Sequence, residues 1–181
     1  IPVCIGIFGT QYRNLIDRES LKRLFGNINY WFARNADDID FVGEVDTEVT
    51  HLGDWLINAF PMTRWSIDKE LVVPPEFIKH TGDLLKTVME IQSYKKVNSA
   101  RLHPLLCATT SAQEVKYSEQ REMGSDASSG KFNSMLIDIF GKNYSEDKYF
   151  TVNRKCVFEY KKFAVYNTEK MKEKIWGICR G

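Results

Sequence analysis

An acidic stretch in the first third of the chain has the side chains that a site for a divalent cation requires. Seven carboxylates and one imidazole fall within positions 37–54: Asp37, Asp38, Asp40, Glu44, Asp46, Glu48, His51 and Asp54. Hard cations such as Mg²⁺ and Mn²⁺ take oxygen ligands, and an imidazole can join them. The pattern is typical of a metal-dependent phosphodiesterase or nuclease that binds Mg²⁺ or Mn²⁺. Its predicted ligands are Asp40, Asp46, Glu48, His51 and Asp54.

Such an enzyme also needs a further carboxylate and a lysine that steadies the scissile phosphate. Glu90, followed by Lys95 or Lys96, is the candidate pair for these roles. Nucleases of this kind place both residues on a strand, whereas the apolar spacing of Leu85, Val88 and Met89 predicts a helix around Glu90. The alternative interpretation is a solvated acidic loop, whose negative charge favours the N-terminus of a following helix.

A cysteine hydrolase is the second chemistry that the residues allow. His51 precedes Cys107, which is the chain order of caspase-like and chymotrypsin-like cysteine proteases, and the two would form a nucleophile and its base. Residues 105–109, however, lack the glycine-flanked cysteine signature of those families. The alternative is that Cys107 is a small buried apolar residue.

A basic and aromatic segment near the C-terminus suggests a third function. Within residues 154–166, lysines and an arginine alternate with Phe and Tyr, which predicts extended structure with a basic, aromatic face. Such a face suits single-stranded nucleic acid, because cations contact phosphates and aromatic rings stack on bases. The predicted phosphate contacts are Arg154, Lys155, Lys161 and Lys162, and Tyr160 is predicted to stack. The alternative is a hairpin with one face in the core and its lysines in water.

The distribution of charge agrees with a basic C-terminal surface. The 181 residues carry 25 Lys or Arg and 24 Asp or Glu, a net charge of +1. Residues 1–70 have 7 basic and 11 acidic side chains, whereas residues 142–181 have 10 and 5. A basic end can attract a polyanion, although opposite charges can also neutralise each other across the fold.

Length and composition indicate one globular domain over residues 1–181. Hydrophobic residues make up 43% of the chain, which excludes a disordered chain, and no apolar stretch is long enough to predict a transmembrane segment. The first residue is Ile1, so we expect a domain cut or processed from a larger chain. Four cysteines are ordinary for a reduced cytoplasmic protein. A secreted form would be expected to pair Cys4 with Cys179 and Cys107 with Cys156.

Apolar spacing predicts an α+β fold that is rich in helix. Strands are expected at residues 3–8, 39–45, 149–152 and 156–166, and the first should share a small mixed sheet with the C-terminal strands. Helices are expected at residues 17–32, 52–60, 75–91, 132–140 and 168–175, with Asp17 and Thr50 as N-caps and Gly141 as a terminator.

Four functions therefore stay open. A nucleic-acid binding or processing module would use the basic C-terminal third. We place this hypothesis first because it predicts a specific surface. The alternatives are the metal-dependent nuclease, the cysteine hydrolase, and a domain that binds another protein or has a structural role without catalysis.

Overall fold

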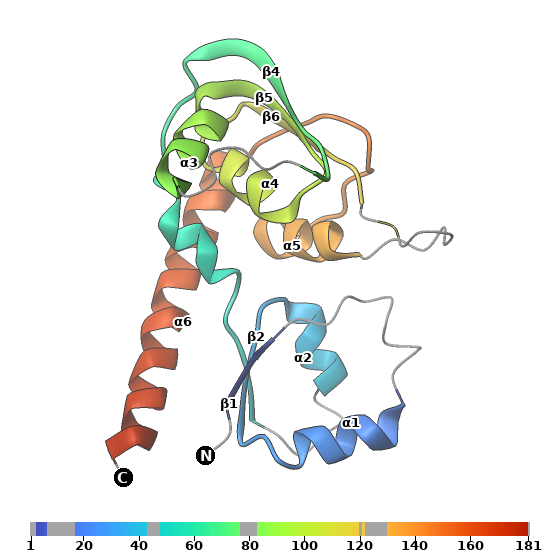
Figure 1. Ribbon diagram of the computed structural model, residues 1–181, viewed down its shortest axis with the longest axis vertical. Helices are drawn as coiled ribbons and strands as arrows, with labels where there is room; N and C mark the ends of the chain where they lie inside the picture. The colour runs from blue at the N-terminus through green and yellow to red at the C-terminus, as the bar shows by residue number, and fades with distance from the viewer. Residues whose placement is uncertain are drawn as a thin grey trace.

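Two small sheets organise the chain in a computed structural model that describes residues 3–6, 17–42, 48–76, 83–119, 121 and 130–180 (Figure 1). The first sheet contains three parallel strands in the order β1 (Val3–Gly6), β2 (Tyr30–Ala33) and β3 (Glu48–His51). Its connections contain α1 (Arg18–Phe25) and α2 (Ala36–Val42). This alternation follows from parallel pairing, which needs a crossover between successive strands.

The second sheet has four strands in the order β4 (Ile67–Val73), β5 (Tyr94–Ser99), β6 (Glu114–Tyr117) and β7 (Phe150–Thr151). The first three are parallel, and β7 pairs antiparallel with β6. Side chains alternate between a buried face with Val73, Val97 and Val115 and a polar face with Lys96 and Glu114. The helices α3 (Leu84–Ser93) and α4 (Leu102–Thr109) contact this sheet.

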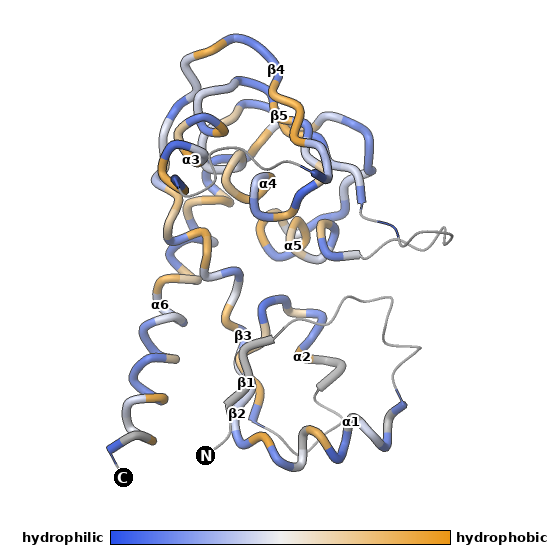
Figure 2. The backbone as a smooth tube through the Cα atoms, in the orientation of Figure 1, coloured by the Kyte–Doolittle hydropathy of each residue, from blue (hydrophilic) through white to orange (hydrophobic). Residues whose placement is uncertain are grey.

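The main hydrophobic core lies around the second sheet. It joins the sheet's buried side chains to apolar residues of α3, α4, α5 (Lys131–Phe140) and the start of α6 (Arg154–Arg180). Figure 2 shows the apolar segments concentrated in this part of the molecule, whereas polar and apolar residues alternate along α6. The 3₁₀ helix η2 (Trp55–Ala59) adds Ile57 and Phe60 to the same core.

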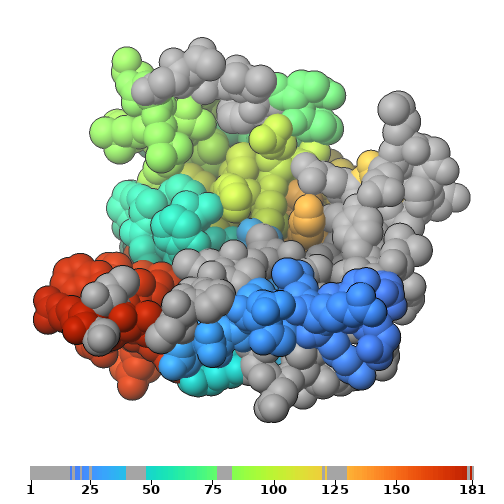
Figure 3. All heavy atoms as spheres, turned by 60° about the horizontal axis from the view of Figure 1, so that its bottom comes forward, coloured from blue at the N-terminus to red at the C-terminus, as the bar shows by residue number. Residues whose placement is uncertain are grey.

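The helix α6 runs past both sheets and ties them together (Figure 1). Its buried stripe, Val157, Tyr160, Ala164 and Thr168, follows helical spacing and faces the rest of the molecule. Further along, the Lys174 ammonium pairs with the Glu48 carboxylate and lies 4.0 Å from the centre of the Tyr30 ring. The last turns of α6 form one side of the surface in Figure 3. None of the helices in the described residues is long and apolar enough to cross a membrane.

The α+β class and its richness in helix are confirmed, and so are several local predictions. Asp17 caps α1, since its carboxylate accepts hydrogen bonds from the Glu19 and Ser20 N–H groups. Gly141 ends α5 with a φ of 70°, a backbone conformation that favours glycine. The strand expected at 149–152 corresponds to β7, and Glu90 lies on a helix.

Three predicted elements in the first sixty residues are wrong. The helix over 17–32 stops at Phe25, because the chain turns at Gly26 and the aromatic run Tyr30–Ala33 forms a strand between two neighbours. The segment 39–45, expected as a strand, lies partly in α2, whose first turn carries Asp37 and Asp38 at the positive end of the helix. Residues 52–60 form only η2, which Asp54 caps, while Thr50 belongs to β3.

The predicted sheet and the C-terminal strands also need correction. β1 pairs with β2 rather than with the C-terminal strands, so the N-terminal and C-terminal strands lie in different sheets. Residues 156–166 are helical, because their buried positions recur every three or four residues rather than every two. The elements β4, β5, β6 and α4 were not predicted.

Candidate functional site

Several polar side chains gather where the parallel strands of the first sheet end. β2 ends at Ala33 and is followed by Arg34 and Asn35, while β3 ends at His51 and is followed closely by Asp54. Open parallel sheets bind ligands at the carboxyl ends of their strands, where connecting loops leave room. In this protein the residues of α5 and α6 approach that edge, so three parts of the chain contribute to one site.

A histidine and a carboxylate form the centre of this site. The His51 Nε2 atom lies 3.0 Å from the Asp138 Oδ2 atom, and the Asp138 side chain is only 3% exposed. The other oxygen of Asp138 accepts a hydrogen bond from the Ala36 N–H at the start of α2. Because an ionised carboxylate only accepts hydrogen bonds, this contact places a proton on Nε2, so that in the neutral tautomer Nδ1 is the basic nitrogen. We call this pair the His51–Asp138 dyad.

A buried ion pair lies at the same edge of the first sheet. The Arg34 guanidinium lies 3.5 Å from the Asp54 carboxylate, with side chains 10% and 2% exposed. The Asp54 N–H donates a 2.7 Å hydrogen bond to the Tyr160 hydroxyl, and Tyr160 is buried. Burial, with the negative charge of Asp138, raises the pKa of Tyr160, so its hydroxyl stays protonated. The first sheet is thus fastened to α6 by polar groups that are shielded from water.

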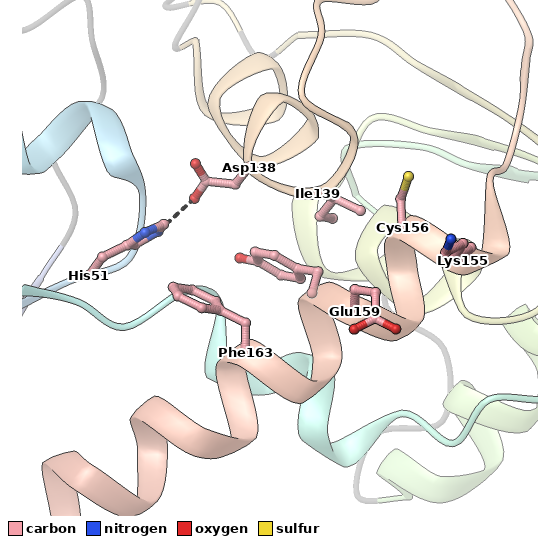
Figure 4. A pocket seen from close by; sticks show the side chains of 8 residues that line it. His51, Asp138, Ile139, Lys155, Cys156, Glu159 and Phe163 are labelled. Atoms are coloured by element: carbon pink, nitrogen blue, oxygen red, sulfur yellow. Dashed lines mark hydrogen bonds and ion pairs between the residues drawn. The ribbon is translucent and has the colours of Figure 1, made fainter.

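A groove of about 570 Å³ opens beside the dyad (Figure 4). This volume lies within the range of small-molecule sites. It is lined by residues of β3, α5 and the first three turns of α6: His51, Asp138, Ile139, Lys155, Cys156, Glu159, Tyr160 and Phe163. The Phe163 ring lies 4.8 Å from the His51 ring, while Lys155 and Cys156 lie at the other end of the groove (Figure 4). The groove therefore combines apolar walls and the carboxylates of Asp138 and Glu159 with an imidazole at one end and an ammonium group at the other.

Gly53 allows α6 to approach β3 closely enough to form this groove. Its φ of 75° is a conformation that side chains rarely adopt. A Cβ atom there would lie 3.2 Å from Phe163 Cε1 and 3.3 Å from the Tyr160 hydroxyl. Both the backbone conformation and the close contact therefore require glycine at this position.

No known family, curated protein or solved structure matches this chain.

Three of the five predicted metal ligands have described side chains, and each has a different partner. Glu48 pairs with Lys174, His51 with Asp138, and Asp54 with Arg34. In the part of the chain that the structure describes, no three His, Cys, Asp or Glu side chains could hold one metal ion. Asp46 and the side chain of Asp40 lie outside the described residues. The bound Mg²⁺ or Mn²⁺ thus gains no support from the described ligands.

The other predicted catalytic residues lie away from the groove. Glu90 is on α3, and Lys95 on β5 pairs with Asp68. Cys107 is buried in the core on α4, and it does not line the groove with His51. Cys107 and Cys156 are both free thiols, so the bridge expected for a secreted form is absent. Cys4 and Cys179 have no described side chains.

The predicted nucleic-acid contacts divide into three groups along α6. Tyr160, predicted to stack on a base, is buried and its hydroxyl accepts a hydrogen bond from the Asp54 N–H, so it contributes to the groove as part of its wall. Lys161 donates to the backbone carbonyl of Ile57 at 2.8 Å at the end of η2, which gives it a structural role. Lys162 pairs with Glu159 on the exposed surface, whereas Arg154 and Lys155 line cavities.

The structure adds residues that sequence reasoning missed, chiefly Asp138, Phe163 and Arg34. Asp138 is 87 residues from His51 in the chain and sits in an ordinary amphipathic helix, so no local pattern marks it. Phe163 belongs to the basic aromatic segment of residues 154–166, but it was not among the residues predicted to bind nucleic acid. A helical reading of residues 154–166 would have placed Phe163 one turn from Glu159.

Cys107 and Cys156 should differ strongly in reactivity. Burial raises the pKa of the Cys107 thiol to about 12, so at pH 8 roughly one molecule in 10⁴ carries the reactive thiolate. With Cys4 and Cys179 replaced by serine, we expect iodoacetamide to label Cys156 in the folded protein and Cys107 only after unfolding, as measured by mass spectrometry. Equal labelling rates would contradict the burial of Cys107 and restore the cysteine-hydrolase hypothesis.

Proposed function

We propose that this chain binds single-stranded nucleic acid, with one base in the groove beside the His51–Asp138 dyad. The observation that supports it is the combination of an aromatic wall, Phe163, with a cation, Lys155, along one cavity. Proteins that bind single strands use this pairing, because the ring stacks on any base and the cation contacts the backbone. Lys155 is exposed, and its ammonium forms no ion pair with the described residues, so it is available to a phosphate.

The dyad supports a second step, hydrolysis of the bound strand, which would make the chain a processing module. Nδ1 of His51 would take a proton from a water molecule while the water oxygen forms a bond to phosphorus. The bond from phosphorus to one ester oxygen then breaks, and the imidazolium returns the proton to that leaving oxygen. Asp138 holds the ring and stabilises its charged form, as carboxylates do beside catalytic histidines. This route uses the side chains of His51 and Asp138 alone and does not call on a metal ion or on the predicted carboxylate ligands.

Binding is tested with a fluorescent single-stranded RNA of about ten nucleotides and matched variants of α6. We expect Phe163→Ala to weaken binding by roughly 5- to 150-fold, the loss for one stacked base. Lys155→Gln should weaken binding and make it less sensitive to salt, with the slope of log affinity against log salt falling by about 0.7. Fluorescence anisotropy at several salt concentrations measures both effects.

The controls come from the outer side of the same helix. Phe158 is exposed like Phe163 but does not line the groove, and the exposed Lys172 pairs with Glu169 further along α6, also outside the groove. Phe158→Ala and Lys172→Gln should bind like the wild type. Equal losses in the control and groove variants would replace the groove by a diffuse basic surface. If the wild type does not bind RNA, the proposed function is wrong and the alternative is a domain that binds another protein. The exposed Tyr166 and Trp176 of α6 would then be the surface to examine.

A further inference from the structure

A second cavity of about 380 Å³ lies beside the start of α6. It is lined by residues from the segment before β4, the turn before β6 and the end of β7: Arg64, Trp65, Ser111, Ala112, Gln113, Thr151, Val152 and Arg154. Ala112 and Val152 are buried and form an apolar floor, while the Trp65 ring is half-buried. This cavity is smaller than the groove but still within the range of ligand sites.

The charge of this second cavity is positive. Two arginines line it, and none of the described lining residues is acidic. Arg64 is exposed and forms no ion pair with any described residue. Arg154 reaches the carbonyls of Thr110 and Ser111 only at 3.5 Å, which is the limit of a hydrogen bond. Both guanidinium groups therefore retain donors for an oxyanion, and Arg can hold phosphate through two parallel hydrogen bonds.

The position of the cavity adds to its positive potential. It lies at the N-terminus of α6, a helix of 27 residues, where the helix dipole favours negative charge. Nearby, the Lys95 ammonium lies 5.0 Å from the centre of the Trp65 ring, although Asp68 pairs with that lysine. An anionic group is thus the ligand that the cavity favours.

The first turn of α6 separates this cavity from the groove. Thr151, Val152 and Arg154 line the cavity, whereas Lys155, Cys156 and Glu159 line the groove. Two consecutive cations therefore serve two adjoining sites, and a chain of phosphates that crosses this turn would meet both. A ligand with a single phosphate would occupy only one of them.

We propose that the cavity between Arg64 and Arg154 is a second phosphate subsite, which holds the backbone next to the nucleotide in the groove. The proposal rests on the proposed function, because it extends the same strand across α6. It predicts that binding strengthens with the number of phosphates, and that the two arginines bind a phosphate group whether or not a base occupies the groove.

The test compares Arg64→Gln with Arg23→Gln, which removes an identical charge from the exposed face of α1 and touches neither cavity. With the ten-nucleotide RNA, Arg64→Gln should lower the salt slope by about 0.7, and Arg64→Gln with Arg154→Gln by about 1.4. Arg23→Gln should leave the slope unchanged. Because Arg64 is exposed, its replacement should not alter the melting temperature, which shows that the fold is intact.

Inorganic pyrophosphate separates this proposal from the proposed function. Calorimetry should show that wild type binds pyrophosphate, that Arg64→Gln weakens it, and that Phe163→Ala does not. If pyrophosphate binds in this way but RNA does not, the subsite stands and the proposed function fails. If RNA binds and its salt slope is the same in Arg64→Gln as in Arg23→Gln, the subsite is overturned and the proposed function stands. If neither ligand binds the wild type, both are overturned.

Discussion

Replacing Asp54 by alanine should destabilise the folded chain by about 3–5 kcal/mol, the range for removing one partner of a buried ion pair. The Arg34 guanidinium would keep its charge, since arginine does not lose its proton in proteins. With a side chain only 10% exposed, it would have neither water nor a carboxylate to stabilise that charge. The substitution also removes the cap that accepts the Leu56 N–H of η2, which adds about 1 kcal/mol.

Two further variants identify the cause of this loss. Asp54→Asn keeps an oxygen to cap η2 but removes the charge, so it should remain strongly destabilised. Replacing both partners, as Arg34→Met with Asp54→Leu, removes the buried charges together and should recover much of the stability. Urea unfolding followed by circular dichroism gives the free energies. A loss below about 1 kcal/mol in Asp54→Ala would mean that Arg34 is in contact with water after all.

The elements that sequence reasoning found are those whose signals are local. The helix α5 has regular apolar spacing and a glycine at its end, and Asp17 starts α1 with its own carboxylate. The residues of β2 were predicted as the end of the helix over 17–32, because Trp31 and Phe32 continue the apolar spacing of the α1 segment. Its strand conformation depends on β1 and β3, which lie on either side of it.

The helix α6 shows how two periods can compete in one segment. Basic and aromatic residues alternate over residues 154–166, which suggests strands, while Val157, Tyr160 and Ala164 follow helical spacing. The helical period is the one that matches burial, and it continues beyond the segment to Thr168. A longer window would have favoured the helix, since only that period persists.

The candidate site could be predicted only in part. His51 stood out as one of three histidines, and Lys155 belonged to the basic segment. Asp138 and Arg34 depend on how α5 and the first sheet pack, which no spacing along the chain reveals. The acidic stretch was interpreted as a metal site because its carboxylates are close in sequence. In the fold, Glu48, His51 and Asp54 have partners from three different elements.

Asp138→Asn should change which nitrogen of His51 carries the proton while leaving the fold intact. The asparagine oxygen can still accept from the Ala36 N–H, so the start of α2 keeps its partner. Its NH₂ group faces His51 as a donor, which requires Nε2 to become the acceptor and moves the proton to Nδ1. Nitrogen chemical shifts of the His51 ring report this change directly, whether or not the chain has activity.

If the dyad supports hydrolysis, the same variant should lower the rate of RNA cleavage by about 10²–10⁴-fold. The proton would then be on Nδ1, and the basic nitrogen would be Nε2, which is occupied by the asparagine NH₂ group. Affinity for the RNA should not fall, because Phe163 and Lys155 are untouched and the substitution removes a negative charge from the groove. Asp138→Ala is the contrasting variant: it frees the ring and also leaves the Ala36 N–H without an acceptor, so it should lose stability as well as rate. An unchanged cleavage rate in Asp138→Asn with an altered tautomer would exclude His51 as the base and leave the groove a binding site.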